Sequence, residues 1–358
     1  MKKYYDCVVV GGGQSGLYAA KLLKERNISY IVLERDKVGQ VWRERLDGMR
    51  LFTSRQFCGL PGLPFPGDAN SFPSANEMGE YLSAFANALQ IHVRENSEVV
   101  TLTKKKDLFT ITLKDGERLT AKSLINATGS NQIPRIPSFN SHLSSNVLQF
   151  DSNLKSLKLV PNETRVVVVG DGATGRQIAG GLADRCNVTL ATGKARSLPA
   201  GSILGKDLFW WLNKIGILFA DKNSILSRFL QKRNPVPCRN FNNQRLKRLG
   251  VRIVGRALNC SERTMFFEKD ETSKVDVVIW ATGYRDNTEW LQMSHCIDEA
   301  GFVEEYGATP EPGLFIIGRK WLSCRASELL MGVPKDAELV INEIEKYLAR
   351  NAVLMQKI

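Results

Sequence analysis

Two short glycine-rich segments hold the residues of this 358-residue chain that are best suited to chemistry. Each has the pattern G-x-G-x-x-G and follows an apolar run: residues 11–16 follow Cys7–Val10, and residues 170–175 follow Val166–Val169. In such a segment the first glycine makes a tight turn, the second lets the backbone approach a pyrophosphate, and the third lets helix pack on strand. The helix that follows offers N–H groups and a positive dipole end to the phosphates. One copy is a weak signal, but two copies in the same strand–turn–helix context predict two bound dinucleotides, an arrangement suited to electron transfer between them.

The first copy is followed by the second element that this chemistry needs. A helical pattern runs from Leu17 to Leu23, and the strand predicted at Tyr30–Leu33 ends in Glu34. Dinucleotide-binding folds carry an acid about 20 residues after the glycines, where it holds a ribose hydroxyl. The alternative, a glycine-rich turn without a ligand, leaves this agreement of strand, glycines, helix and acid unexplained.

The second copy lacks that acid. The strand predicted at Asn187–Ala191 is followed instead by Thr192, Lys194 and Arg196. Cationic side chains at this place accommodate a 2′-phosphate, which favours NADPH over NADH. Arg176, directly after the last glycine, is a further candidate phosphate contact. Solvated loop charges are the alternative interpretation, so NADH stays open.

A repeated tripeptide indicates how the two copies are organised. Ala127-Thr128-Gly129 and Ala281-Thr282-Gly283 each follow an apolar strand, at similar distances downstream of a glycine-rich segment. We therefore expect an α/β fold of two Rossmann-like dinucleotide-binding domains, with the second inserted into the first. The first would comprise residues 1–150 and 283–358, and the second residues 155–280.

Composition narrows the function classes. Hydrophobic residues make up 43% of the chain, as a packed core requires, and the net charge is +12. A basic surface attracts anions, but the sequence has no nucleic-acid-binding signature, so we expect no nucleic-acid partner. The seven cysteines include no C-x-x-C pair, which argues against a dithiol–disulfide centre built on a local pair and against a common zinc site. We expect a cytoplasmic protein without a signal peptide, a transmembrane segment or a metal.

These motifs together resemble those of the small bacterial flavin-containing monooxygenases, including the CzcO-like flavoproteins. The resemblance covers nearly the whole chain. It rests on the two glycine-rich segments with Glu34, both Ala-Thr-Gly motifs, and the stretches that follow: residues 38–43, 60–67, 207–212 and 318–333.

The resemblance implies FAD on the first copy and NADPH on the second, in an FAD-binding and an NAD(P)H-binding domain. The implied FAD contacts are Gly11, Gly13, Gln14, Ser15, Gly16, Glu34, Arg35, Gln40, Val41, Trp42, Val99, Thr128, Gly129 and Gly318. The implied nicotinamide-cofactor contacts are Gly170, Gly172, Thr174, Gly175, Arg176, Thr192 and Lys194. No side chain is expected as a catalytic acid, base or nucleophile, because the cofactor carries the chemistry. Arg43, Arg319 and Arg325 are candidates to stabilise reduced flavin, with solvated arginines as the alternative.

The expected reaction is hydride transfer from NADPH to FAD, followed by oxygenation of a small sulfide, amine or ketone with O2. Between its domains the chain departs from the longer monooxygenases: their F-x-G-x-x-x-H-x-x-x-[FW] fingerprint is not matched at residues 139–152. An NAD(P)H oxidase or flavin-dependent reductase that passes electrons to O2, a quinone or a protein therefore remains an alternative, as does a low-turnover redox-sensing flavoprotein.

One apolar stretch, residues 203–219, is expected to be a packed helix of the insert or of a dimer interface. A substrate lid and a peripheral membrane contact are the alternatives.

Overall fold

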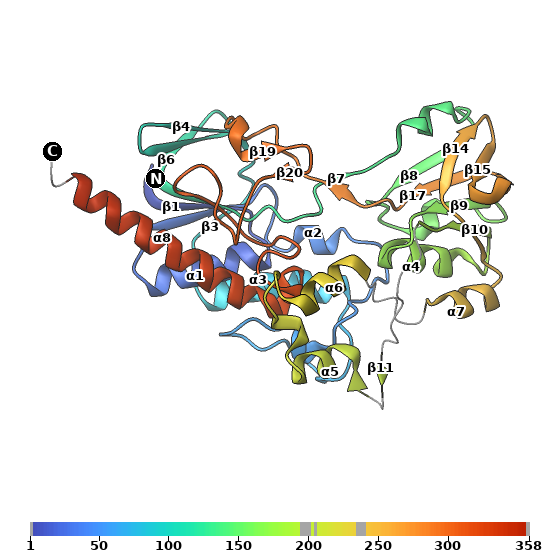
Figure 1. Ribbon diagram of the computed structural model, residues 1–358, viewed down its shortest axis with the longest axis horizontal. Helices are drawn as coiled ribbons and strands as arrows, with labels where there is room; N and C mark the ends of the chain where they lie inside the picture. The colour runs from blue at the N-terminus through green and yellow to red at the C-terminus, as the bar shows by residue number, and fades with distance from the viewer. Residues whose placement is uncertain (1–2, 194–201, 204–205, 234–240, 356–358) are drawn as a thin grey trace.

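The computed structural model describes residues 3–193, 202–203, 206–233 and 241–355. Figure 1 shows two α/β units side by side, with β7 between them. The architecture is the expected mixed α/β fold with parallel strands in both sheets.

The first unit is built on a sheet in the order β3-β2-β1-β6-β5-β4, with β21 beside β6. Its strands are β1 (Tyr4–Val10), β2 (Tyr30–Leu33), β3 (Val93–Arg94), β4 (Val99–Lys105), β5 (Leu108–Leu113), β6 (Arg118–Asn126) and β21 (Leu314–Ile316). The strands β3, β2, β1, β6 and β21 run parallel, and β4 and β5 form antiparallel pairs. The first half of β6 pairs with β5, and its second half lies between β1 and β21.

Helices cover one face of this sheet, and a loop region covers the other. Side chains of β1 and β2 pack on α1 (Gln14–Glu25), α3 (Ala75–Ala88) and α8 (Val333–Met355) on the first face. On the second face Trp290 and Phe302 close the core over β1 and the β4–β5 hairpin. The helix α3 begins with a capping box, in which Ser74 and Glu77 bind each other's backbone N–H groups.

The second unit is built on a fully parallel sheet in the order β13-β10-β9-β17-β8. Its strands are β8 (Leu148–Asp151), β9 (Arg165–Val169), β10 (Asn187–Ala191), β13 (Arg252–Val254) and β17 (Val277–Trp280). The helices α4 (Ala173–Leu182) and α7 (Asn243–Arg248) and the antiparallel strands β14 (Ala257–Ser261), β15 (Thr264–Phe267) and β16 (Thr272–Lys274) accompany it. The expectation that residues up to 150 lie with the first unit differs from this sheet at β8, which pairs with β17.

Two segments that pass between the units lie against each other. The outgoing chain forms β7 (Ile133–Pro134) and the returning chain forms β18 (Tyr284–Arg285), and the two pair antiparallel. The Arg135 N–H also donates to the Gly283 carbonyl at 2.9 Å. The second unit is thus attached through a two-stranded connection rather than a single linker.

Part of the second chain segment returns to the first unit. We call residues 206–233 the excursion; it contains α5 (Leu208–Lys214), η4 (Ile217–Phe219) and α6 (Ile225–Arg233). Phe209 and Leu218 are buried against the segment 324–329 of the first unit. The Ser54 N–H donates to the Asp207 carboxylate, and the Lys335 ammonium donates to the Phe219 carbonyl, each at 2.9 Å.

The excursion therefore packs on the first unit, although the sequence placed all of 155–280 in the second domain. The apolar stretch 203–219 was expected to be a packed helix of the insert or of a dimer interface; instead its described part forms the short α5 and η4, which pack on the first unit through Phe209 and Leu218. Within the described residues no helix combines the length and the apolar character needed to cross a bilayer.

Candidate functional site

The first glycine-rich loop is closed on one side and open on the other. A Cβ on Gly11 would lie 2.6 Å from the Ala127 carbonyl oxygen, and one on Gly16 would lie 1.9 Å from the Gly11 carbonyl oxygen. Both positions therefore require glycine for packing. A Cβ on Gly13 would meet no atom within 4 Å. Gly13 thus borders open space at the start of α1, which is where a pyrophosphate approaches in this motif.

The second loop repeats this geometry position by position. A Cβ on Gly170 would lie 2.1 Å from the Ala281 carbonyl oxygen, and one on Gly175 would lie 2.1 Å from the Gly170 carbonyl oxygen. Gly172, like Gly13, has open space around its missing side chain. In both units the first glycine packs on the alanine of the Ala-Thr-Gly motif, so the repeated tripeptide corresponds to one contact made twice.

The helices that follow the two loops begin without a side-chain cap. Gly13 and Gly172 occupy the N-cap positions of α1 and α4, and no described side chain accepts a hydrogen bond there. The first N–H groups of a helix need an acceptor from elsewhere, and a phosphate supplies it. Both loops therefore fit a dinucleotide pyrophosphate.

Glu34 is held at the first loop. One of its carboxylate oxygens accepts from the Gly12 N–H at 2.6 Å, and the other accepts from the Asp36 N–H at 3.1 Å. The side chain is almost buried, at 9% exposure. Because each carboxylate oxygen can accept a second hydrogen bond, Glu34 fits the ribose contact expected from the sequence.

Four further predicted contacts gather at the start of α1. The Trp42 indole N–H donates to the Gln14 carboxamide oxygen at 3.4 Å. A Cβ on Gly318 would lie 2.9 Å from Ser15 Oγ, so the segment after β21 passes close to this helix. The structure thus brings residues from α1, α2 (Gln40–Arg43) and the segment after β21 to one place.

Four predicted FAD contacts lie apart from the first glycine-rich loop. Arg35 pairs with Asp36, and the Gln40 carboxamide donates to Glu44. Val99 begins β4 opposite Leu113, and the Val41 side chain is 44% exposed. None of these four is hydrogen-bonded to the first glycine loop in the described structure. Their contact with FAD remains a proposal.

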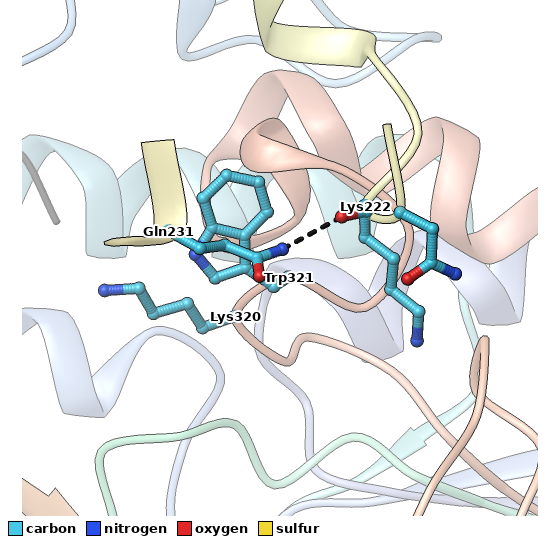
Figure 2. A pocket seen from close by; sticks show the side chains of 5 residues that line it. Lys222, Gln231, Lys320 and Trp321 are labelled. Atoms are coloured by element: carbon cyan, nitrogen blue, oxygen red, sulfur yellow. Dashed lines mark hydrogen bonds between the residues drawn. The ribbon is translucent and has the colours of Figure 1, made fainter. Parts of the chain in front are cut away.

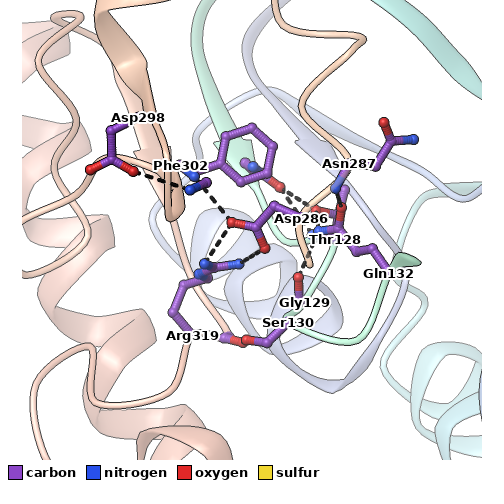
Figure 3. A network of polar contacts seen from close by, with 12 residues as sticks. Thr128, Gly129, Ser130, Gln132, Asp286, Asn287, Asp298, Phe302 and Arg319 are labelled. Atoms are coloured by element: carbon purple, nitrogen blue, oxygen red, sulfur yellow. Dashed lines mark hydrogen bonds and ion pairs between the residues drawn. The ribbon is translucent and has the colours of Figure 1, made fainter. Parts of the chain in front are cut away.

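A polar network joins the first Ala-Thr-Gly motif to the chain that returns from the second unit (Figure 3). The Gln132 carboxamide donates to Thr128 Oγ1 at 2.7 Å and to the Gly129 carbonyl at 2.6 Å. Its oxygen accepts from the Asn287 N–H at 2.6 Å. Sequence patterns gave no signal for Gln132 or Asn287, since neither belongs to a motif.

The same network contains an ion pair next to Gly318, in which Asp286 is buried and the Arg319 side chain is 18% exposed. The Arg319 guanidinium donates to both oxygens of Asp286, at 2.5 and 2.7 Å, and the Phe302 N–H donates to one of them at 3.0 Å. Asp286 is 7% exposed. Of the three arginines considered for the flavin, Arg319 thus belongs to this pair, Arg43 donates to the Val38 and Gly79 carbonyls, and Arg325 pairs with Glu328.

The second loop has different surroundings from those expected. Arg176 is 1% exposed; its guanidinium pairs with Asp171 and donates to the Phe241 carbonyl and the Asn243 side chain, each at 2.8 Å. The Thr192 hydroxyl donates to the Val254 carbonyl. Arg176 therefore ties the loop to the start of α7 instead of facing open space, and burial of a basic side chain after the third glycine could not be read from the motif. Lys194 and Arg196 lie outside the described residues.

Known proteins of similar sequence show the family to which this chain belongs. A family model described as pyridine nucleotide-disulphide oxidoreductase matches residues 8–202. An uncharacterized CzcO-like oxidoreductase of Geobacillus kaustophilus is 33% identical over 96% of this chain and 99% of its own length. The chain belongs to the CzcO-like oxidoreductases of this family.

Solved structures share the CzcO-like fold at lower identity. A flavin-containing monooxygenase from Stenotrophomonas maltophilia superposes with a TM-score of 0.80 at 22% identity, covering 97% of this chain and 99% of that one. A protein named OTEMO, in complex with FAD and NADP, superposes with a TM-score of 0.67 at 19% identity, covering 98% of this chain and 87% of that one. At these identities the likeness establishes the two-unit fold.

The cysteines of this CzcO-like protein do not form a redox pair among the described residues. Six are described, and all are free. Burial raises the pKa of Cys7 to about 12 and that of Cys58 to about 11, so both stay protonated near neutral pH. No cluster of His, Cys, Asp and Glu suited to a metal occurs in the described part of the chain.

Proposed function

We propose that this protein is an FAD-dependent oxidoreductase that takes hydride from NADPH and uses O2 to monooxygenate a small soft nucleophile, a sulfide or amine, or a ketone. The observation that carries the proposal is that the two glycine-rich loops, which we call the cradles, have the same geometry. In each loop the first and third glycines pack against backbone, and the second borders open space. We infer that each cradle binds one dinucleotide and that the two dinucleotides exchange electrons. The Stenotrophomonas monooxygenase, similar over its whole length, supports oxygen as the acceptor.

The chain itself binds and positions the two cofactors. Gly13 and the N–H groups at the start of α1 would hold the FAD pyrophosphate, and Glu34 its ribose. Gly172 and the start of α4 would hold the pyrophosphate of NADPH. When bound, FAD supplies the hydride-accepting ring and the reaction with O2, and the protein supplies orientation and a dry site.

The connection between the units would set how the second glycine-rich loop is placed relative to the first. The β7–β18 pair, Gln132 and the Asp286–Arg319 ion pair fix the returning chain against the strand that ends in Gly318. Precise placement of two reactants contributes strongly to rate, so we assign these residues a positioning role.

The proposal is tested by measuring NADPH oxidised, O2 consumed and H2O2 released by the FAD-loaded protein. Thioanisole, trimethylamine and cyclohexanone serve as probes of the three substrate classes. A monooxygenase releases less H2O2 per NADPH when its substrate is present, and an oxygenated product appears. Peroxide equal to NADPH with every probe would favour an oxidase, and faster NADPH oxidation with a quinone would favour a reductase.

The cellular setting follows from the same features. The free cysteines suit a reducing compartment, so we propose the cytoplasm. Small-molecule substrate and O2 are the partners that the proposed reaction needs.

A further inference from the structure

The helix α6 of the excursion turns apolar side chains toward solvent. Ile225 is 90% exposed and Phe229 is 50% exposed, and the two lie one turn apart on the same face of the helix. Ser227 lies on the opposite face, where it is fully buried and donates its hydroxyl to the Ala220 carbonyl at 3.2 Å. A surface helix of a globular domain has the reverse arrangement, with its apolar side chains inward. The orientation of α6 therefore exposes the side chains that water disfavours.

The inner side of α6 is held against the first unit. The Gln231 carboxamide donates to the Lys222 carbonyl at 3.0 Å, and Gln231 and Trp321 line one pocket between the excursion and the segment after Gly318. Figure 2 shows the Gln231 carboxamide beside the Trp321 indole. The helix cannot turn Ile225 inward without breaking these contacts.

Exposed apolar side chains are concentrated in the excursion. Single exposed apolar residues are common on protein surfaces and need no explanation. Here the two most exposed large apolar side chains of the described structure, Ile225 and Ile215, both belong to the excursion, and Ile215 is 64% exposed. Leu226 and Phe229 are exposed next to Ile225. A group of this kind marks a surface that binds a partner or a membrane.

Basic side chains border the apolar face of α6. By helical spacing Arg228 and Lys232 lie along one edge of it, and the Arg233 guanidinium lies over the Phe229 ring at 4.4 Å. The helix has no acidic residue, and none of its three cations is paired with a carboxylate in the part of the chain that the structure describes. We call Ile225, Phe229 and these three cations the outer face of α6.

The surrounding sequence carries most of the charge of the protein. Residues 222–261 contain ten Lys and Arg and no Asp or Glu, in a chain whose net charge is +12. The two carboxylates of the excursion are already bonded to the first unit: Asp207 accepts from the Ser54 N–H, and Asp221 accepts from the Tyr306 hydroxyl, each at 2.9 Å. The outer face therefore attracts an anionic partner.

An anionic lipid surface is the partner that uses both features of this face. Its phosphates attract Lys and Arg, and the acyl chains directly beneath them accept apolar side chains. A nucleic acid would bind the cations and leave Ile225 and Phe229 in water. A second copy of this chain would cover the apolar side chains, but a two-fold axis would bring the same cations together.

We propose that the outer face of α6 binds an anionic lipid surface. Ile225 and Phe229 enter the boundary between headgroups and acyl chains, and Arg228, Lys232 and Arg233 contact the lipid phosphates. The excursion thus attaches the first unit to the membrane without spanning it. This inference does not rest on the proposed function, because it concerns where the protein binds and its test measures no turnover.

The test is co-sedimentation of the FAD-loaded full chain with vesicles of two compositions. Phosphatidylcholine vesicles are the neutral probe, and mixed phosphatidylcholine–phosphatidylglycerol vesicles are the anionic one. The protein should sediment with the anionic vesicles and stay in solution with the neutral ones, and added salt should weaken the binding.

Variants of the outer face separate its two contributions. Phe229→Ser and Ile225→Ser should each weaken binding to anionic vesicles about tenfold, the scale of one inserted apolar side chain. Arg228→Gln and Lys232→Gln should each weaken it about fivefold, as expected for one cation at an anionic surface. All four positions are exposed, so the variants should fold and keep their FAD content.

Two matched controls lie elsewhere on the protein. Leu159→Ser removes an apolar side chain that is 57% exposed in the second unit, and Lys114→Gln removes an exposed lysine of the β5–β6 turn. Both should bind anionic vesicles like wild type. Equal loss in the controls and in the α6 variants would show that net charge and hydrophobicity alone decide the binding, and would overturn the assignment to α6.

Three further results would overturn the proposal. The first is equal binding to both kinds of vesicle, or binding to neither. The second is unchanged binding in Phe229→Ser and Ile225→Ser, which would leave a nonspecific electrostatic attraction. The third is a dimer in sedimentation velocity that Phe229→Ser dissociates while vesicle binding is absent, which would assign the outer face to a second copy of this chain.

Discussion

The Arg319 guanidinium donates to both carboxylate oxygens of Asp286, and this pair joins the chain returning from the second unit to the strand end beside the first cradle. Arg319 directly follows Gly318, whose position near Ser15 places it at the start of α1. Asp286 lies two residues after β18-forming Tyr284, in the returning chain. This ion pair thus fixes the chain that has returned from the second unit beside the first glycine-rich loop.

Breaking this pair should weaken both stability and hydride transfer. Asp286→Ala leaves Arg319 without its carboxylate, and because the Arg319 side chain is 18% exposed and can be solvated, the loss should cost about 1–3 kcal/mol. We expect a lower denaturant midpoint and slower flavin reduction at saturating NADPH. Glu343→Gln, in the exposed Lys346–Glu343 pair, is the control and should stay within about 0.5 kcal/mol of wild type. A stable variant with an unchanged reduction rate would remove the positioning role.

Substitution of Gly13 should affect FAD binding, and substitution of Gly172 should affect NADPH binding. Gly13→Ala adds a methyl group into open space at a backbone angle that alanine adopts, so the protein should fold but lose FAD on purification. Gly172→Ala should keep FAD and bind NADPH about tenfold or more weakly, because its methyl group occupies the phosphate approach. Flavin content and NADPH titration measure both effects. Retention of both cofactors in both variants would contradict the cradle assignment.

Removing the Glu34 carboxylate should weaken FAD specifically. Glu34→Ala loses the acceptor at the Gly12 N–H and the proposed ribose contact, so the FAD dissociation constant should rise about ten- to a hundredfold, as expected for hydrogen bonds to a charged group. Glu25→Ala, at an exposed glutamate of α1, is the control. Equal FAD affinity in the two variants would place the ribose elsewhere.

Acid should remove the contribution that the Glu77 carboxylate makes to the free energy of unfolding. The backbone N–H of Ser74, followed by Arg55, lowers the pKa of Glu77 from 4.5 to about 2. A depressed folded-state pKa stabilises above the unfolded value, so this contribution is present above pH 4.5 and is lost as pH falls toward 2. Glu77→Gln should therefore be less stable than wild type at pH 7 by up to about 1 kcal/mol, since the side chain is 38% exposed. The difference, measured by urea unfolding, should shrink below pH 4; a constant difference would contradict the assignment.

Alkylation should distinguish this protein from a disulfide reductase. Cys7 and Cys58 are buried with raised pKa values, so iodoacetamide should modify them slowly in the folded protein. We expect NADPH-dependent flavin reduction to survive alkylation and Cys58→Ser. Loss of the flavin–NADPH reaction on alkylation would point to a thiol in the electron path.

The parts of this fold that depend on local sequence patterns could be predicted from the sequence. Apolar runs before the glycines predicted β1 and β9, and the glycine spacing predicted how each loop packs, because only glycine fits against Ala127 and Ala281. The family resemblance and the two-sheet architecture were confirmed.

Contacts between distant segments could not be predicted in the same way. Asp286, Gln132 and Asn287 are joined by long-range hydrogen bonds that leave no periodicity in the sequence. The excursion packs on the first unit because Phe209 and Leu218 find an apolar partner there, although its position in the chain suggested the second unit. Arg176 was expected at a phosphate and is buried against Asp171, since one basic residue serves either role with the same spacing.

The most direct test of the account is anaerobic mixing of the purified FAD-loaded protein with NADPH, followed through the visible absorbance of oxidised flavin. The account predicts rapid loss of this absorbance, slower reduction in Gly172→Ala, and, after oxygenated buffer is added, a blue-shifted band that persists until a substrate is present. Failure to bind FAD at all, or no reduction by either NADPH or NADH, would contradict the central claim that two dinucleotides exchange electrons in this chain.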